Sequence, residues 1–296
     1  MTGRVWASKE ELETACSLYE FTWWETSPTV QAMRADAGAH PGLLGRITAA
    51  RNAGLVRTRD VYVDDAGHYI PQRTALHEAI VSRCVPRRTT HGHPDWIPEA
   101  FFTIGCPGAG KTSTLRALVR AYRELSHGRA GMPLAIVDAD QVRMDLPEYV
   151  SGLGSAVVDP ECYDVTYGRV FPAALSSGSD LVYDTLGRID SIRPNIERLI
   201  DAGYGVHVLR AEAPSGVCCA RALDRALTRD GRLVSERLVK ETAEAASETM
   251  RVLRRDKVPL AGWAEIDTAH PSGVLVALAA DPVWAAALPT LLAANG

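Results

Sequence analysis

The stretch that decides the fold runs from residue 100 to residue 119 and reads AFFTIGCPGAGKTSTLRALV. It starts with a short apolar run that is typical of a buried strand, passes through a glycine-rich loop, and continues with apolar residues at helical spacing. The loop from Gly105 to Thr112 fits the pattern G-x-x-x-x-G-K-[S/T] in full. A strand, this loop and a helix in succession predict a phosphate-binding P-loop rather than a chance glycine-rich turn.

Each residue type in this loop has a physical task. Glycines let the backbone curl so that successive N–H groups point at phosphate oxygens, and the following helix turns its positive end to the same place. We therefore expect Lys111 to reach the β- and γ-phosphates of ATP and the Thr112 hydroxyl to bind Mg²⁺. The residues expected to bind the nucleotide are Gly105, Pro107, Gly108, Ala109, Gly110, Lys111, Thr112 and Ser113.

From residue 99 onward, short apolar runs alternate with longer helical stretches, and the runs end near residues 104, 138, 184, 210 and 269. This alternation predicts an α/β fold, in which a five-stranded, mostly parallel sheet is covered by helices. Ligands of such sheets bind outside the carboxyl ends of the strands. We expect residues 96–296 to form a P-loop kinase domain of this class.

The first part of the chain, residues 1–95, is expected to be a mostly helical extension with a regulatory role. Within it, residues 61–70 predict a hairpin around a turn at residues 65–67, and residues 71–85 predict a helix. Near the other end, residues 273–294 are expected to form a pair of short helices, because Asp281, Pro282 and Pro289 interrupt an apolar stretch that could otherwise span a membrane.

Composition excludes several classes of function. The chain has 32 Lys and Arg against 36 Asp and Glu, and a net charge of -4 argues against a nucleic-acid binder. Its six cysteines form no C-x-x-C pair and no zinc pattern, which favours a reduced, cytoplasmic environment. The charged N-terminal residues lack the apolar segment of a secretory signal.

Two of the expected strands end in carboxylates. Asp138 and Asp140 close the run AIVDAD, and Asp184 closes the run LVYD. A kinase needs one group that organises Mg²⁺ and one group that accepts the proton of the substrate hydroxyl. We interpret the three carboxylates as candidates for these tasks, and helix capping or turn formation is the alternative.

Arginines recur at four-residue spacing at positions 221, 225 and 229, so one face of a helix carries them, and Arg232 follows a break at Asp230-Gly231. Such arginines can neutralise the phosphate in transfer, or they can belong to a solvated, ion-paired helix face. The residues alone favour the second interpretation for Arg221 and Arg229.

Taken in order, several blocks resemble the zeta-toxin family, P-loop kinases of toxin–antitoxin systems. The blocks are TIGCPGAGKTS, LAIVDAD, DLVYDTLGR, AGYGVHVLRAEAPS and the helix with Arg225 followed by Arg232, and the likeness runs from about residue 70 to residue 270. Members phosphorylate the 3′-hydroxyl of the amino sugar in UDP-N-acetylglucosamine. The resemblance implies an ATP- and Mg²⁺-dependent transfer of the γ-phosphate to a hydroxyl of such a UDP-amino sugar.

The resemblance also implies roles for single residues. Asp140 matches the general base of the family, and Arg225 and Arg232 match the arginines that contact the transferring phosphate. Asp184 and Thr185 stand where the family has an E-G-T block that contacts the sugar nucleotide, and Leu186 replaces its hydroxyl donor. The predicted catalytic set is Lys111, Asp140, Arg225 and Arg232, and the predicted metal ligands are Thr112 and Asp184.

The departure at residues 184–186 weakens the assignment of the acceptor, because a site that loses a hydrogen-bond donor discriminates differently. Another nucleotide, a dinucleotide or an antibiotic is an alternative acceptor, and a nucleotide-gated interaction protein is an alternative function.

Arg143 could clamp an anionic acceptor or form an ion pair. The predicted acceptor-binding residues are Asp138, Arg143, Asp184, Thr185 and Arg188; the predicted partners are a small hydroxyl acceptor and an antitoxin, or residues 1–95 acting in cis.

Overall fold

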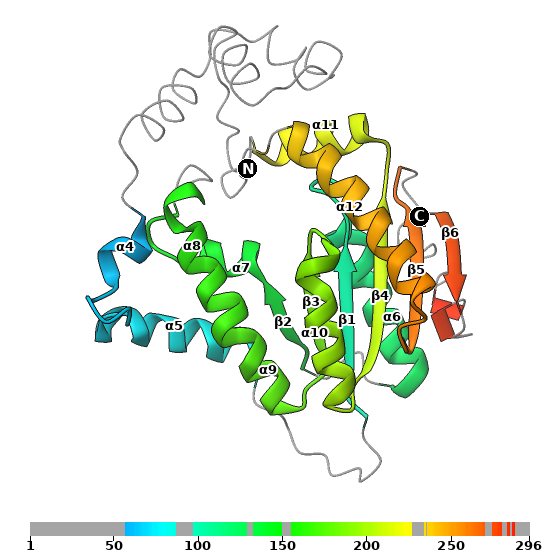
Figure 1. Cartoon of the computed structure of the whole chain (residues 1–296). Coiled ribbons are helices and arrows are strands. Elements are labelled where there is room, and N and C mark those ends of the chain that lie inside the picture. Colours follow the sequence, from blue (N-terminus) through cyan, green and yellow to red (C-terminus); the bar gives the residue numbers. More distant parts are fainter. Residues whose placement is uncertain are drawn as a thin grey trace, which may run out of the picture.

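The computed structural model describes residues 57–86, 97–128, 133–149, 155–226, 234, 236–269, 274–279, 283–284 and 286–287. Its centre is a six-stranded sheet with the order β2-β3-β1-β4-β5-β6 (Figure 1). The strands are β1 (Glu99–Ile104), β2 (Ala135–Asp138), β3 (Leu181–Thr185), β4 (Gly205–Glu212), β5 (Gly262–Asp267) and β6 (Val274–Ala279). The first five are parallel to their neighbours, and β6 pairs with β5 in the antiparallel sense.

This arrangement confirms the predicted α/β kinase fold with its five parallel strands and adds a sixth strand at one edge. The helical segments are α4 (Thr58–Tyr62), α5 (Pro71–Cys84), η1 (Lys111–Leu115), α6 (Arg116–His127), α7 (Ala139–Met144), α8 (Ser155–Val165), η2 (Thr166–Val170), α9 (Phe171–Ser177), α10 (Ile189–Asp201), α11 (Ser215–Ala226) and α12 (Glu236–Arg255). The segments η1 and η2 are single wide turns of π-helix. Such turns are rare in proteins overall, and where they occur they are often at functional sites.

The alternation of side chains along the strands builds two separate cores. In β1, Phe101 belongs to one apolar cluster and Phe102 to the other, and Val182 and Tyr183 divide in the same way in β3. Successive side chains of a strand point to opposite faces, so a strand that is apolar throughout needs cover on both sides. All six residues of β1 are buried, which follows from this.

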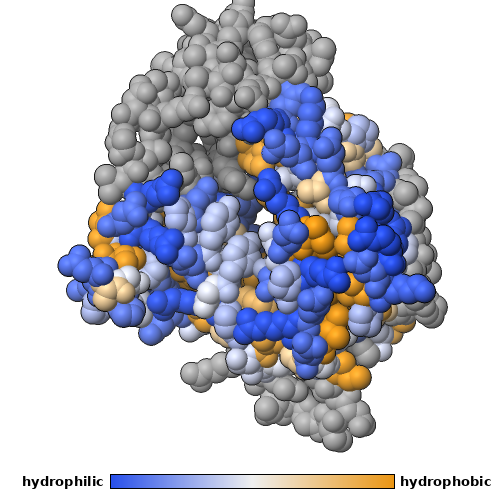
Figure 2. All heavy atoms as spheres, in the orientation of Figure 1, coloured by the Kyte–Doolittle hydropathy of each residue, from blue (hydrophilic) through white to orange (hydrophobic). Residues whose placement is uncertain are grey.

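Helices supply that cover on both faces (Figure 1). Ile192 and Ile196 of α10 lie in the cluster with Phe102, whereas Leu118 and Val119 of α6 lie in the cluster with Phe101. The outer face of α12 is polar, and Figure 2 shows hydrophilic side chains over it. Each helix therefore buries one apolar face against the sheet and turns the other to water.

Two local predictions were wrong. Residues 274–279 form β6 instead of the first of two short helices, because an apolar run without periodicity suits either structure and the open edge of β5 pairs with it. Residues 61–70 do not form a hairpin: α4 ends at Tyr62, and a single antiparallel bridge joins Val63 to Tyr69. The predicted turn is present, since Asp64 Oδ1 accepts hydrogen bonds from the N–H groups of Ala66 and His68.

The helix predicted over residues 71–85 is confirmed as α5, with Pro71 in its first turn. Its residues Ile80 and Cys84 belong to the same apolar cluster as Phe102, so α5 packs on the edge of the sheet beside β2 (Figure 1). The predicted extension before residue 57 lies outside the described residues, and the boundary near residue 95 stays a prediction. No helix within the described part of the chain is long and apolar enough to cross a membrane.

Candidate active site

The glycine-rich loop follows β1 directly and has a backbone that only glycine allows. Gly105, Gly108 and Gly110 all have positive φ, at 146°, 82° and 83°. A Cβ on Gly108 would lie 2.0 Å from the carbonyl oxygen of Cys218 in α11, and a Cβ on Gly105 would lie 2.6 Å from that of Ala211. The loop is therefore pressed against β4 and α11, with room for the backbone alone.

The residues after the third glycine open the wide turn η1. The Lys111 ammonium group folds back and donates to the carbonyl oxygens of Gly105 at 2.7 Å and Cys106 at 3.3 Å. Thr112 and Ser113 lie exposed in the first turn of η1, and the Ser113 hydroxyl donates to the Gly110 carbonyl. Within the loop itself, Pro107 and Ala109 are buried. This is a cradle of backbone amides with one ammonium group, which fits a polyphosphate.

Thr268, just after β5, supports the loop through its side chain, and sequence reasoning did not identify it. Its hydroxyl donates to the Ala109 carbonyl oxygen at 2.7 Å, across 159 residues of sequence. Arg221 of α11 donates to the Thr268 carbonyl oxygen at 2.8 Å. Arg221 is thus tied to the loop's support, instead of belonging to a purely solvated helix face.

Two predicted carboxylates stand side by side at the ends of β2 and β3, where Asp138 and Asp184 are paired in the parallel register. Asp138 caps α7, because its Oδ1 accepts hydrogen bonds from the N–H groups of Asp140 and Gln141. Its Oδ2 forms an ion pair with Arg116 of α6 at 2.5 Å. The capping alternative therefore holds for Asp138, and Arg116 is a site residue that sequence reasoning missed.

Asp184 is electrostatically the most perturbed carboxylate of the group. Burial raises its pKa to about 7; the neighbouring charges of Asp138 and Asp140 raise it too, and Lys111 and Arg116 lower it. The parallel register places Asp184 beside Asp138, and the ion pair of Asp138 brings Arg116 to the same end of the strands. A carboxyl group held in this way gains from a nearby cation, which favours its charged form.

The donor set fits magnesium bound together with phosphates. Among the described residues, no group of three or more His, Cys, Asp or Glu side chains could hold a metal ion by itself. Mg²⁺ in such sites takes only one or two protein oxygens, and substrate phosphates and waters complete its shell. The Thr112 hydroxyl, exposed in η1, and the Asp184 carboxylate, at the end of β3, are the predicted protein ligands, and this role stays a prediction.

Asp140, in the first turn of α7, is about half exposed (44%) and has two arginine neighbours. Arg143, one turn further along α7, contacts its Oδ1, and Arg225 of α11 lies 4.0 Å from its Oδ2. The structure therefore brings together Asp140, Arg225 and the strand-end carboxylates, although they come from distant parts of the sequence. Arg229 and Arg232 lie outside the described residues.

Arg143 is almost completely buried (1% exposed) and its guanidinium lies between two carboxylates of the protein. Its Nε donates to Asp159 Oδ1 at 2.8 Å, and its Nη1 contacts Asp140. Burial opposes its charge, but Asp140 and Asp159 together raise the pKa of Arg143. The structure thus contains the ion pair that was one of two alternatives, while the role of a clamp for the acceptor stays a prediction.

The loop after β3 carries the remaining predicted residues. Thr185 Oγ1 accepts a hydrogen bond from the N–H group of Gly187 at 3.4 Å, and Arg188 is exposed at the start of α10. Gly187 has a φ of 82° and lies so close to β1 that a Cβ would meet that of Ile104 at 2.8 Å. This close approach fixes the path of the loop beside the P-loop strand.

Comparison with known proteins gives a family and a fold. Residues 86–261, more than half of the chain, match the family model described as Zeta toxin. The solved complex of AvrRxo1-ORF1 and AvrRxo1-ORF2 with sulphate ions contains a similar chain, with 19% identity and a TM-score of 0.56 over 81% of this chain and 95% of that one. The same complex with ATP gives 17% identity and a TM-score of 0.55 over the same shares.

A chain of the PezAT chromosomal toxin–antitoxin system of Streptococcus pneumoniae is similar at 15% identity, with a TM-score of 0.50 over 76% of this chain and 88% of that one. At these identities the likeness to solved structures concerns the fold. A search of curated proteins gives no match.

Proposed function

Because the chain belongs to the zeta-toxin family, we propose that it is an ATP- and Mg²⁺-dependent kinase that transfers the γ-phosphate to a hydroxyl group of a small molecule. Family membership and the kinase-like fold support a kinase-type phosphotransferase. The observation that carries the proposal is a glycine-built loop at the carboxyl end of β1, beside the carboxylates that end β2 and β3. Phosphoryl transfer needs mainly positioning and charge stabilisation, and this edge of the sheet offers both.

On the donor side, the backbone N–H groups of Gly108 and of residues 110–113 bind the phosphates, and Lys111 leaves its carbonyl partners to contact the β- and γ-phosphates. Thr112 and Asp184 hold magnesium, which neutralises charge on the phosphate oxygens when it is bound. Arg116 keeps Asp138 in its capping position, so the end of β2 stays fixed beside the metal ligands.

On the acceptor side, Asp140 is the general base. Its carboxylate takes the proton of the attacking hydroxyl as the new O–P bond forms, the bond between the γ-phosphorus and the bridging oxygen breaks, and ADP leaves with the electron pair. Arg225, already 4.0 Å from Asp140, offsets charge on the phosphate in transfer, and we assign the same task to Arg232.

For the acceptor we propose a UDP-amino sugar such as UDP-N-acetylglucosamine, on the strength of the family. Asp138, Arg143, Asp184, Thr185 and Arg188 are the residues proposed to surround it. The sequence Asp184-Thr185-Leu186 makes another nucleotide, a dinucleotide or an antibiotic the alternative, because Leu186 cannot donate a hydrogen bond to the sugar nucleotide.

We further propose that the activity is restrained by a protein partner in the cytoplasm. The similar chains occur in an AvrRxo1-ORF1:AvrRxo1-ORF2 complex and in a toxin–antitoxin system, which supports a separate antitoxin. Residues 1–95 acting in cis are the alternative, and a nucleotide-gated interaction protein without transfer is the second candidate function. We propose no nucleic-acid or membrane partner.

The decisive experiment incubates the purified protein with Mg²⁺, ATP and a metabolite extract, and searches by mass spectrometry for a gain of one phosphate. We expect phosphorylation of one acceptor, with UDP-N-acetylglucosamine tested first. Lys111→Ala and Asp140→Asn should each lower transfer by about 1,000-fold or more, because each removes a group acting on the reacting atoms.

The matched control is Asp201→Asn, which neutralises an exposed carboxylate at the far end of α10 and should transfer at the wild-type rate. Binding of ATP without transfer to any metabolite would contradict the kinase and favour the nucleotide-gated alternative. Equal activity of Asp140→Asn and wild type would remove Asp140 from the role of base.

A further inference from the structure

The general base of the proposed reaction is in contact with a buried arginine, Arg143, whose contacts with the protein are themselves informative. Arg143 connects Asp140, on its own helix α7, to Asp159 on α8, with Nη2 of Arg143 at 2.7 Å from Asp159 Oδ1. A guanidinium in contact with two carboxylates from two helices has little freedom to rotate. The carboxylate of Asp140 therefore has a fixed neighbour, although 44% of its side chain is exposed.

The position of α8 decides where Asp159 stands, and α8 is anchored through its other face. Residues two apart on an α-helix lie on nearly opposite sides, so Glu161 points away from the partner of Asp159. Glu161 is fully buried and binds Arg73 of α5 through both of its oxygens, at 2.5 Å and 2.8 Å. His77 of α5 also contacts Glu161, at 2.5 Å.

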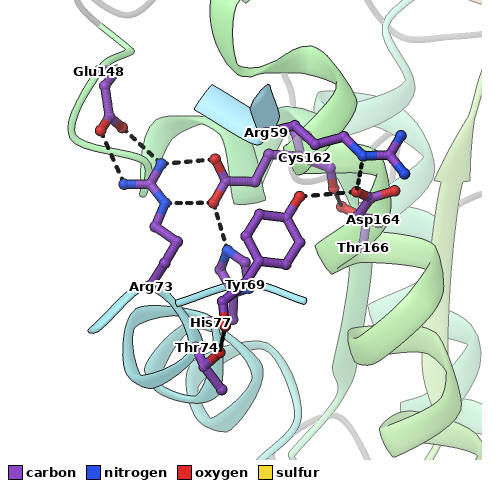
Figure 3. Close-up of polar contacts among 10 residues, drawn as sticks. Arg59, Tyr69, Arg73, Thr74, His77, Glu148, Cys162, Asp164 and Thr166 are labelled. Atoms are coloured by element: carbon purple, nitrogen blue, oxygen red, sulfur yellow. Dashed lines mark hydrogen bonds and ion pairs between the residues drawn. The ribbon is translucent and has the colours of Figure 1, made fainter. Parts of the chain in front are cut away.

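The cluster around Arg73 extends beyond this one pair (Figure 3). Arg73 also forms two hydrogen bonds to Glu148, at 2.9 Å and 2.8 Å, in the segment that follows α7. Tyr69 donates its hydroxyl to Asp164 of α8 at 2.9 Å, and Arg59 pairs with the same carboxylate at 3.1 Å. Residues 59–77 therefore contact α8 at Glu161 and Asp164, and they contact the segment after α7 at Glu148.

We propose that Arg143 and Asp159 are positioning residues for Asp140, and that α5, acting through α8, is the element that fixes them. The inference rests on the proposed function, because it assigns these ion pairs to the orientation of the base. It also assigns a task to residues 59–77, which precede the stretch of residues 86–261 matched by the family model.

The physical reason is that a base works only when its oxygen lies within hydrogen-bond reach of the hydroxyl. A displacement of about 1 Å at a reacting group can cost about 100-fold in rate. Asp140 is in the first turn of a helix of six residues, which is too short to be rigid by itself. The ion pairs to α8 supply the missing restraint.

The test uses the full chain and three variants. Asp159→Ala removes one partner of Arg143 without touching Asp140 or the P-loop, and Asp159→Asn keeps an oxygen that can accept a hydrogen bond. Arg123→Gln is the matched control, because Arg123 is also buried and pairs with a carboxylate, Asp180, at 3.1 Å. Asp180 directly precedes β3 and so lies at the amino end of the strands, whereas the P-loop lies at the carboxyl end of β1.

Two measurements are made on each folded variant. Amide hydrogen exchange follows the peptide that contains α7 and needs no acceptor. Steady-state kinetics follow ADP release with ATP and UDP-N-acetylglucosamine, or with the acceptor that the metabolite search yields. Asp159→Ala should raise exchange in α7 about tenfold and lower kcat by about 100-fold, with the KM for ATP changed less than about twofold. Asp159→Asn should recover part of both, and Arg123→Gln should change neither.

Wild-type exchange in α7, or wild-type kcat, in folded Asp159→Ala would overturn the inference. A raised KM for the acceptor with unchanged exchange would also overturn it, since Asp159 would then bind the acceptor. A wild-type protein without any transfer contradicts the proposed function, and exchange in α7 then decides alone whether the ion pairs hold this helix in place.

Discussion

The two sides of the site are built in different ways. On the phosphate side, the loop of residues 105–110 takes its shape from backbone geometry, with three glycines at positive φ and a close approach to α11. On the acceptor side, Asp140 takes its place from side-chain ion pairs that run through Arg143 and α8 to α5. On the phosphate side, Gly105 and Gly108 leave no room for a side chain. The acceptor side depends instead on charge partners in helices that are far apart in sequence.

This difference predicts how each side fails. A side chain added to the glycine-rich loop overlaps with neighbouring atoms, and the main consequence is a lower affinity for the bound phosphates. A network of buried charges fails by leaving one charge without its partner, which costs folding stability wherever the network reaches. Variants of the two sides should therefore separate into those that lose nucleotide binding and those that lose stability.

The largest effect on nucleotide binding is expected from Gly108→Ala. Its Cβ would lie 2.0 Å from the Cys218 carbonyl oxygen, so the loop must move and the amides lose their common target. We expect the affinity for ATP, measured by calorimetry, to fall by about 100-fold or more. The control Gly203→Ala shares the same strain, with φ at 83° against 82°, but has nothing within 4 Å of its Cβ. It should cost about 1–2 kcal/mol of stability and leave ATP affinity unchanged.

Arg73→Gln should have the largest effect on stability, and it should leave nucleotide binding unchanged. It leaves Glu161, which is fully buried, without its main partner, and removing one member of a buried ion pair costs about 3–5 kcal/mol. Denaturant unfolding measures this loss. Arg193→Gln, which breaks partly exposed surface pairs with Glu197 and Asp256, should cost less than about 1 kcal/mol. Weaker ATP binding in Arg73→Gln would contradict the separation of the two sides.

The smallest effect is the pH dependence of the same network. Burial opposes the charge of Glu161, but hydrogen bonds from His77 and Arg73 lower its pKa from 4.5 to about 2. A lowered pKa in the folded state adds stability above pH 4.5, and this contribution is lost as the pH falls from 4.5 towards 2. The loss amounts to about 3 kcal/mol.

Unfolding free energies measured between pH 7 and pH 2 check this dependence. Glu161→Gln, which cannot titrate, should be less stable at pH 7 and should show a flatter decline over the acid range. An equally steep decline in both proteins would assign the acid sensitivity to other carboxylates.

The phosphate side and the parallel sheet could be predicted from the sequence because both are local patterns. Residues 100–119 contain strand, loop and helix in one continuous stretch, and each further strand is an apolar run that can be recognised by itself. The edge strand β6 was missed because its run carries no period, and only the partner strand decides between strand and helix.

The supports of the site could not be predicted, because each joins segments that are distant in sequence. Arg116 and Asp138 are 22 residues apart, Arg73 and Glu161 are 88 apart, and Thr268 and Ala109 are 159 apart. A single arginine in a helix gives no sign of which carboxylate it will meet. Arg143 illustrates this limit, since its residue type suited both an acceptor clamp and an internal ion pair.

The wide turn η2 between α8 and α9 holds one residue more than an α-helical turn. One residue corresponds to about 100° of rotation about the helix axis, so this turn sets the angular phase between the two helices. Phe171, the first residue of α9, directly follows this turn and packs edge-on against Tyr183 at a ring distance of 5.3 Å. A shortened homologue with a regular helix here would have to fill the space beside this tyrosine from a different sequence position.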